Sequence, residues 1–445
     1  MIGCVGLVLA ACVVSSPDEA DLPTVHLVSD EPQATLVGRA VLEDGGRAAD
    51  AAAAIGMAMA VTLPSRVGVG GGGACLIYDP ETDTLDALDF LPRAVEDRTA
   101  AVPMLARGLF ALQARYGRLR WQRSVAGAEE LARFSATVSR SFFADYQSVL
   151  PLLARDPAAV RGFSRPDGQP LEEGDPMIQP ALAEVLARLR MAGSDGMASA
   201  ELAAAYAAFA GRVGLRLDAA AIGTERPRWL APTLIPVGND VVGVFPGPTA
   251  GGDRLADGVR GVANGLAQTR DAVTQAIRGI HPTTASTAPG ASLVVRDGSG
   301  QTVACGLTMI GPFGAGRFVP PMGVFPAPAP TDDAVLVGGL AIKLNRPTSD
   351  VLLAVAGTGL TEPVATVLVE VGIGDRDLAE AITAPRTAMR PDGTLQDERA
   401  PDSMAELGRV IGLACPRVQG GAGPCRAVAE PRADGLAFSG LPVSF

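Results

Sequence analysis

The stretch from Gly45 to Phe90 reads GGRAADAAAAIGMAMAVTLPSRVGVGGGGACLIYDPETDTLDALDF. Its first half predicts a buried, alanine-rich helix over Arg47 to Thr62, which begins after a glycine turn and ends before a proline. A glycine run, Gly70 to Gly73, leads into a predicted apolar strand, Ala74 to Tyr78. A second predicted strand, Leu85 to Phe90, follows a short turn. The stretch therefore indicates a helix packed on a pair of strands.

Two features of this stretch have structural explanations. Asp50 lies in the first turn of the predicted helix, where a carboxylate can accept hydrogen bonds from helix and loop N–H groups. The run Gly70 to Gly73 resembles a phosphate cradle, but no Gly-Lys-Ser/Thr follows it. We expect the glycines to allow close backbone packing instead.

The rest of the chain alternates between helical and strand patterns. The predicted helices after the opening stretch are Leu105 to Tyr116, Val125 to Ser135, Val138 to Leu153, Ile178 to Met191, Ala198 to Val213, Thr361 to Gly372 and Asp377 to Thr383. The predicted strands are Val241 to Phe245, Ser292 to Arg296, Thr302 to Thr308, Ala334 to Leu344 and Val351 to Ala356. This order favours layers of helix on either side of two packed sheets.

Composition excludes several classes of function. The chain has 445 residues, of which 48% are hydrophobic, and its formal net charge is -11. Lysine and arginine form no block, so the electrostatic footprint that nucleic-acid binding needs is missing. With only His26 and His281 in the chain, a histidine-based metal centre is not expected. We expect no metal, no cofactor and no nucleic-acid partner.

The N-terminal residues are expected to be a signal and a tether. Residues 1–12 contain a short apolar run that ends LAAC at Cys12, which resembles a bacterial lipobox with Cys12 as the lipidated residue. No basic residue precedes the run, so an ordinary secretory signal or a misassigned start codon are alternatives. Residues 13–33 are expected to form a tether. This interpretation predicts an exported periplasmic lipoprotein anchored to a membrane, and Val13 favours the outer membrane.

The remaining cysteines fall into two pairs. Cys75 and Cys305 lie in apolar predicted strands, where we expect them to behave as small buried hydrophobic residues. Cys415 and Cys425 flank a glycine-rich loop and could form a local disulfide in an oxidising periplasm. Their spacing fits no zinc pattern.

Four motifs further along the chain occur in a recognisable order. They are Phe245 to Gly252 (FPGPTAGG), Val294 to Asp297 (VVRD), Phe313 to Gly316 (FGAG) and the glycine-containing segment Val355 to Arg386. Together with the opening stretch they resemble the gamma-glutamyltranspeptidase family, and the likeness covers most of residues 34–390. The resemblance implies an α+β, four-layer αββα N-terminal-nucleophile hydrolase fold. It also implies one domain over residues 34–445, with a large-subunit-like part (34–288) and a small-subunit-like part (289–445).

The resemblance implies a particular chemistry. Family members cut themselves before a threonine, whose hydroxyl then acts as nucleophile and whose freed amine acts as base. Main-chain N–H groups stabilise the oxyanion, and here Gly359 and Leu360 stand at the corresponding glycine pair. An arginine clamps the α-carboxylate of the substrate, and an acidic residue holds its α-amine.

This chain departs from that pattern at several positions. Counting back from Val294, the threonine position falls on Pro289, which has no hydroxyl. A two-residue insertion would place Thr287 there as the catalytic candidate. Leu91 takes the place of the clamping arginine, with Arg93 two residues later as a weak substrate-binding candidate. The segment where the acidic partner is expected, residues 322–330, contains no carboxylate, and the first one after it is Asp332.

Two hypotheses follow from the resemblance and its departures. In the first, the chain is a degenerate envelope lipoprotein that lacks the nucleophilic threonine. In the second, it is an active enzyme that hydrolyses or transfers gamma-glutamyl groups of small glutathione-like peptides. The active form would cut itself in the loop at residues 283–292.

Overall fold

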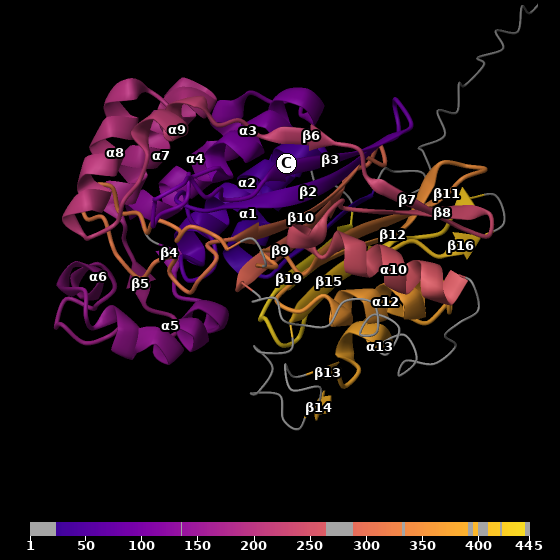
Figure 1. The fold of residues 1–445 in the computed structure, drawn as a ribbon. Coiled ribbons are helices and arrows are strands. Elements are labelled where there is room, and N and C mark those ends of the chain that lie inside the picture. The colour runs from indigo at the N-terminus through magenta and orange to yellow at the C-terminus, as the bar shows by residue number, and fades with distance from the viewer. Residues whose placement is uncertain are drawn as a thin grey trace, which may run out of the picture.

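The computed structural model describes residues 24–134, 136–263, 288–331, 334–389, 395–398, 408–418 and 421–440. Figure 1 shows two sheets stacked between two helical layers, which confirms the expected α+β fold with αββα layering. Cys12 and Thr287 lie outside the described residues. Within the described part of the chain, no helix combines the length and apolar character needed to cross a bilayer.

The first sheet contains seven of the described strands, all antiparallel to their neighbours. Their order is β19 (Leu436–Gly440), β1 (Val25–Ser29), β9 (Gly290–Arg296), β10 (Thr302–Thr308), β2 (Gly72–Asp79), β3 (Thr84–Phe90) and β6 (Arg228–Leu230). Strands β1, β2, β9 and β10 are buried almost throughout, because helices cover one face and the second sheet covers the other.

The second sheet contains six of the described strands and is also antiparallel. Their order is β18 (Arg426–Val428), β15 (Arg409–Ala414), β12 (Asp350–Thr358), β11 (Gly339–Asn345), β8 (Asp240–Val244) and β7 (Thr233–Val237). Short pairs are formed by β4 (Ala136–Thr137) with β5 (Pro176–Met177), β13 (Thr387–Met389) with β14 (Leu395–Asp397), and β16 (Arg417–Val418) with β17 (Gly421–Ala422).

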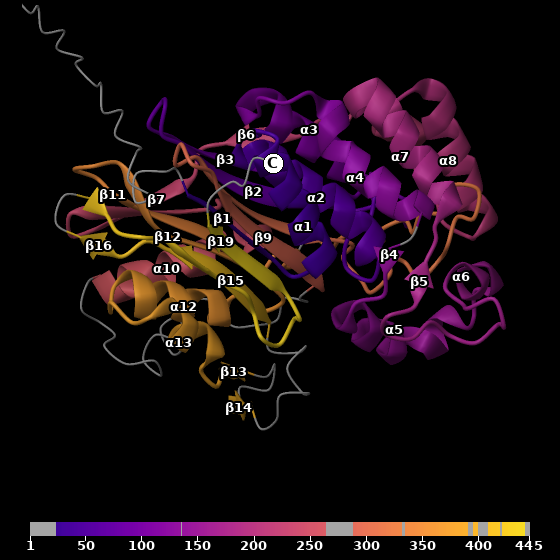
Figure 2. The same ribbon diagram turned by 180° about the vertical axis from the view of Figure 1, so that it is seen from behind.

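Helices from the N-terminal half cover the first sheet. They are α1 (Pro32–Glu43), α2 (Ala48–Thr62), α3 (Leu105–Tyr116) and α4 (Trp121–Phe134), with α7 (Pro180–Ala192), α8 (Ala200–Arg212) and α9 (Ala219–Thr224) further out. The second sheet is covered by α10 (Gly252–Ala263), α12 (Glu362–Gly372) and α13 (Leu378–Thr383). Figure 2 shows the remaining pair, α5 (Arg140–Leu153) and α6 (Pro157–Gly162), beside these layers.

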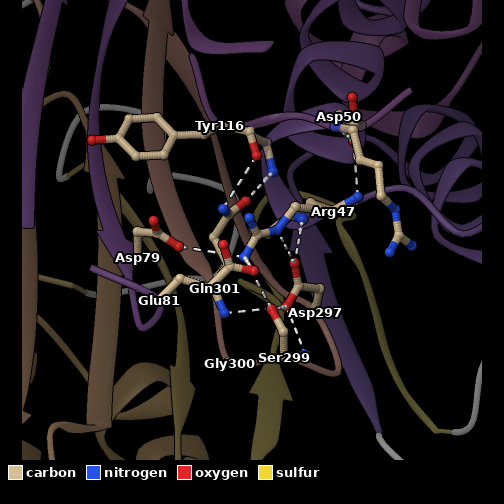
Figure 3. Close-up of polar contacts among 12 residues, drawn as sticks. Arg47, Asp50, Asp79, Glu81, Tyr116, Asp297, Ser299, Gly300 and Gln301 are labelled. Carbon is tan, nitrogen blue, oxygen red and sulfur yellow. Dashed lines mark hydrogen bonds and ion pairs between the residues drawn. The ribbon is translucent and has the colours of Figure 1, made fainter. Parts of the chain in front are cut away.

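Helix α2 is the centre of the first core, and all of its residues are buried. Its alanines favour the helix and leave room for close packing. At its N-terminus, the Asp297 carboxylate accepts from Ala48 N (2.9 Å) and the Gln301 amide oxygen accepts from Ala49 N (3.1 Å). Figure 3 shows Asp297 and Gln301 on the hairpin, together with Arg47 and Asp50. The β9–β10 hairpin therefore caps α2.

Asp50 holds the neighbouring loop, as its position predicts. Its carboxylate accepts from the backbone N–H groups of Arg47 (2.9 Å), Arg118 (2.8 Å) and Leu119 (3.2 Å), and from Gln113 Nε2 (3.0 Å). These four hydrogen bonds offset the free-energy cost of burying the carboxylate.

The glycine run packs against neighbouring backbone. A Cβ added to Gly70 would lie 2.2 Å from Phe325 O, and one added to Gly72 would lie 2.1 Å from Phe90 O. Only a residue without a side chain fits at such distances. The run therefore serves strand packing.

The fold begins before residue 34, so the expected tether is wrong for residues 25–33. Strand β1 is fully buried between β9 and β19, and α1 begins at Pro32. The Glu31 side chain caps α1 by accepting from Ala34 N (2.7 Å). The polar and proline-containing composition suggested a linker, but these polar residues satisfy buried N–H groups.

The cysteines form two disulfides, Cys75–Cys305 and Cys415–Cys425. The first corrects our expectation of free buried thiols. Cys75 and Cys305 lie directly opposite each other on β2 and β10, with Cα atoms 4.1 Å apart. The second disulfide joins the end of β15 to the segment before β18.

Candidate functional site

The backbone at the start of β9 is firmly held. Pro289 directly precedes this strand, at the position expected for the family's nucleophile. Its carbonyl accepts a hydrogen bond from Thr308 Oγ1 (2.9 Å), and the next carbonyl, of Gly290, accepts one from Thr358 Oγ1 (3.2 Å). The side chain at this position therefore supplies an apolar ring and no nucleophilic atom.

A cavity of about 260 Å³ lies at this point, between the ends of the two sheets and α5. It is bounded by strands β9, β12 and β15 and by the loops that follow α2 and β10. The lining residues are Ser65, Arg66, Asp145, Ser148, Ala288, Pro289, Gly290, Pro312, Thr358, Gly359 and Arg409. Ser148 and Pro312 are exposed, so the cavity opens to solvent on the α5 side.

Arg66 forms a bidentate ion pair at the cavity. Its Nε donates to Asp145 Oδ2 (2.6 Å) and its Nη2 donates to Asp145 Oδ1 (2.8 Å), which is a bidentate pair. Ser65 Oγ donates to the same carboxylate (2.7 Å). The third nitrogen, Arg66 Nη1, is buried and has no hydrogen-bond partner among the described residues.

Arg409, the first residue of β15, is 8% exposed and contributes a second guanidinium. Its Nε is buried and has no partner in the described part of the chain. Burial, together with repulsion from Arg66, lowers the pKa of Arg409 to about 10. The two guanidinium groups are therefore close enough to repel each other across the site.

Asp30, after β1, is the nearby buried carboxyl group. Asp30 Oδ2 accepts from Ser292 N (2.8 Å), whereas Oδ1 has no partner among the described residues. Burial raises the pKa of Asp30 to about 6, although Arg66, the Ser292 N–H and Arg409 act in the opposite direction. Asp30 is therefore about half protonated at pH 6, and it compensates the arginines less as the pH falls below that value.

The structure brings some of the expected site residues to the cavity. Gly359 lines it next to Pro289, and its φ of +78° requires the freedom of glycine. Leu360 follows in the chain but is not among the lining residues. Thr287, the catalytic candidate, lies outside the described residues.

Arg93 does not reach the cavity, so it is not a replacement for the missing clamp. Its Nη1 donates to Glu225 Oε2 (2.7 Å) and to Arg226 O (2.9 Å). Leu91 is buried in the core between the two sheets. Leu91, at the clamp position, therefore packs in the core, and Arg93 pairs with Glu225 away from the cavity.

The arrangement can bind an anion but offers little for acyl transfer. Histidine is absent from the residues that line the cavity. Of the lining hydroxyls, Ser65 donates to the Asp145 carboxylate, Ser148 to Asp145 O and Thr358 to Gly290 O. The Asp145 carboxylate beside Ser65 is a weak base, because its bidentate pair with Arg66 outweighs burial and lowers its pKa. No group of residues suited to hold a metal occurs in the described segments.

Sequence reasoning missed Arg66, Asp145, Arg409 and Asp30. They come from four distant segments, and only the folded sheets bring them together. Arg66 lies within the opening stretch, four residues before the start of the glycine run, but a single arginine in a loop carries no specific signal.

Comparison with known proteins agrees with this fold. The sequence model of the family described as Gamma-glutamyltranspeptidase matches residues 34–256, half of the chain. A glutathione hydrolase proenzyme of Bacillus subtilis (strain 168) is 31% identical over 190 residues, covering 37% of this chain and 32% of the relative. That of Escherichia coli (strain K12) is 28% identical over 191 residues, covering 38% and 33%. The chain thus spans about a third of the length of these curated relatives.

Solved structures extend the likeness of fold beyond the matched half. Cephalosporin acylase from Bacillus halodurans superposes with a TM-score of 0.77 at 18% identity, covering 97% of this chain and 99% of the acylase chain. The gamma-glutamyltranspeptidase of Helicobacter pylori gives a TM-score of 0.53 at 22% identity, covering 59% and 82%. At such identities the likeness concerns the fold alone. The motif order, the layered sheets and the match over residues 34–256 lead to one assignment: this chain is a member of the gamma-glutamyltranspeptidase family.

Proposed function

We propose that this chain is a family member without self-cleavage or gamma-glutamyl transfer. The observation that carries the proposal is Pro289 at the start of β9, held in place through its carbonyl by Thr308. Self-cleavage needs a side-chain hydroxyl to attack the preceding carbonyl, and catalysis then needs that hydroxyl beside a free amine. Proline supplies no hydroxyl, and its amine would be a secondary one within a ring.

The substrate side of the site supports the same proposal. Leu91 stands at the clamp position and is buried in the core, whereas Arg93 pairs with Glu225. A gamma-glutamyl donor would therefore lose its main carboxylate contact even if a nucleophile were supplied. On this proposal the fold has kept a pocket and lost the reaction.

The test is whether the purified protein cuts itself. We expect a single full-length band after prolonged incubation and a background rate of release from a chromogenic gamma-glutamyl anilide. The Thr287→Ala variant is the matched control, because Thr287 is the candidate nucleophile of the alternative. Two fragments from a cut at residues 283–292, with an anilide rate abolished by Thr287→Ala, would instead establish an active gamma-glutamyl hydrolase or transferase acting on glutathione-like peptides.

We further propose that the protein is an exported lipoprotein of the bacterial periplasm, with Cys12 as the lipidated residue. The support is the LAAC sequence that ends at Cys12 after a short apolar run. Expression of the full chain in a bacterial host should place it in the detergent-soluble membrane fraction, with the outer membrane favoured. The Cys12→Ser variant should be released from that fraction, and equal retention of both proteins would contradict the proposal.

A further inference from the structure

The cavity beside Pro289 contains two buried guanidinium groups and few partners for them. Arg66 and Arg409 are 2% and 8% exposed, and both line the cavity. Asp145 satisfies two nitrogens of Arg66, but Arg66 Nη1 and Arg409 Nε have no acceptor among the described residues. Buried donors are normally paired, and an unpaired buried cation is costly.

We propose that this cavity is a binding site for a small carboxylate, which the Arg66 and Arg409 guanidinium groups hold between them. A carboxylate has two oxygens that match the donor geometry of guanidinium groups. This binding site rests on the proposed function. Ala288 and Pro289 both line the cavity, so a chain that is not cut between them keeps this part of the wall intact.

The charges of the described residues favour a monoanion at the binding end. Asp145 forms the bidentate pair with Arg66, and Arg409 has Asp145 and Asp30 as neighbouring carboxylates, of which Asp30 becomes neutral below about pH 6. Glu430, the other acidic group near Arg409, is engaged by Arg386 and Arg432. At neutral pH the two arginines and the two carboxylates nearly balance, and protonation of Asp30 below about pH 6 leaves up to one positive charge, which one carboxylate would balance and a phosphate dianion would exceed.

The size of the cavity limits the rest of the ligand. A volume of about 260 Å³ is below the range of about 300–1,000 Å³ that is usual for drug-sized ligands. Pro289, Ala288 and Gly359 supply the less polar part of the wall, so a short organic acid fits better than a tripeptide. Entry is from the α5 side, where Ser148 and Pro312 are exposed.

The test is isothermal titration of the full-length, uncut protein at constant ionic strength. The probes are acetate and succinate, with inorganic phosphate as a separate arm. We expect saturable binding of at least one carboxylate, weakened about tenfold or more in Arg409→Gln, since a hydrogen bond to a charged group contributes on this scale. Arg133→Gln is the control, because Arg133 is a partly exposed arginine on α4 that pairs with Glu129. It should bind like the wild type.

A second variant keeps the test decisive if Arg409→Gln does not fold. Ser148 is exposed at the mouth of the cavity, so Ser148→Phe should fold normally and obstruct entry. Absence of carboxylate binding, equal binding in the wild type and both cavity variants, or binding of phosphate alone would overturn the proposal. Self-cleavage is read from a gel, so a failure of the proposed function is seen separately from a failure to bind.

Discussion

The N-terminus of α2 and the cavity beside β9 are both buried and polar, but they differ in whether their polar atoms have partners. At α2, Asp50 accepts from four donors, and the hairpin residues Asp297 and Gln301 cap the helix (Figure 3). At the cavity, Arg66 Nη1, Arg409 Nε and Asp30 Oδ1 have no partner among the described residues. The network at α2 therefore stabilises the fold, whereas the cavity has the unpaired polar atoms that are typical of a ligand-binding site.

The largest expected effect comes from breaking the satisfied network. Asp50→Ala removes the acceptor of three backbone N–H groups and of Gln113 Nε2, so we expect the free energy of unfolding to fall by about 3–5 kcal/mol. Urea denaturation measures this loss. Asp44→Ala is the control, because the half-exposed Asp44 side chain pairs with the partly exposed Arg123. Equal losses in the two variants would remove the distinction between the regions.

The next prediction concerns Asp30 and has the opposite sign. Its pKa rises from 3.8 to about 6 on folding, so the ionised carboxylate destabilises the folded protein above about pH 6. The cost shrinks as pH falls from about 6 to 4 and vanishes below the ordinary Asp pKa. Asp30→Asn stays neutral and keeps an oxygen for Ser292 N. We expect it to be more stable than the wild type by up to about 3 kcal/mol at about pH 8, and equally stable at about pH 3.

Denaturation at a series of pH values tests this difference. Asp218→Asn is a control of opposite sign, because a hydrogen bond from Ala221 N lowers the pKa of Asp218. That variant should be less stable than the wild type at neutral pH. If Asp30→Asn were also destabilised at about pH 8, the view of Asp30 as an uncompensated charge would be wrong.

A smaller gain is expected from Arg409→Gln. Without added carboxylate, the variant loses a buried cation whose Nε has no acceptor among the described residues, so the free energy of unfolding should rise by about 1 kcal/mol. Saturating carboxylate should stabilise the wild type and reduce or reverse this difference. Chemical denaturation with and without acetate measures both quantities. A variant that is less stable than the wild type without ligand would show that Arg409 is a structural residue.

The smallest effect is expected from Arg93→Gln. Arg93 pairs with Glu225, which is about one-third exposed, so the loss should be about 0.5–1 kcal/mol. Carboxylate binding should be unchanged, because Arg93 does not line the cavity. Titration of the variant checks this point, and weakened binding would restore Arg93 as a site residue.

The sequence predicted the central elements well. The helix over Leu105–Tyr116 and the strand over Thr302–Thr308 have the predicted bounds, because periodicity and flanking prolines or glycines mark their ends. Strand β1 was missed, since five buried residues inside a polar segment show no alternation. Strand β11 begins at Gly339 and not at Ala334, because the apolar residues before it pack between the sheets without joining a ladder.

The site was predictable only where the chain order of motifs fixes a position. Pro289 and Gly359 were placed by counting from neighbouring motifs, and both line the cavity. Arg66, Asp145 and Arg409 could not be placed, because their proximity depends on how a loop, α5 and β15 meet in three dimensions. Arg93 was misjudged for the same reason, as its distance along the chain from Leu91 says nothing of the direction of its side chain.

The position of β1 has a consequence for how the chain reaches its native state. Val28 pairs with Val294 on one side and with Ala437 on the other, so both partners of the first described strand come from much later in the sequence. Such long-range pairing is slow, because a large loop must close before any contact is gained. During synthesis, β1 must wait unpaired until β9 has been made, and its second neighbour is added only with β19. The edge strand β19 can therefore be added only after the segments before it have been made, and a chain stopped before β19 would lack this edge.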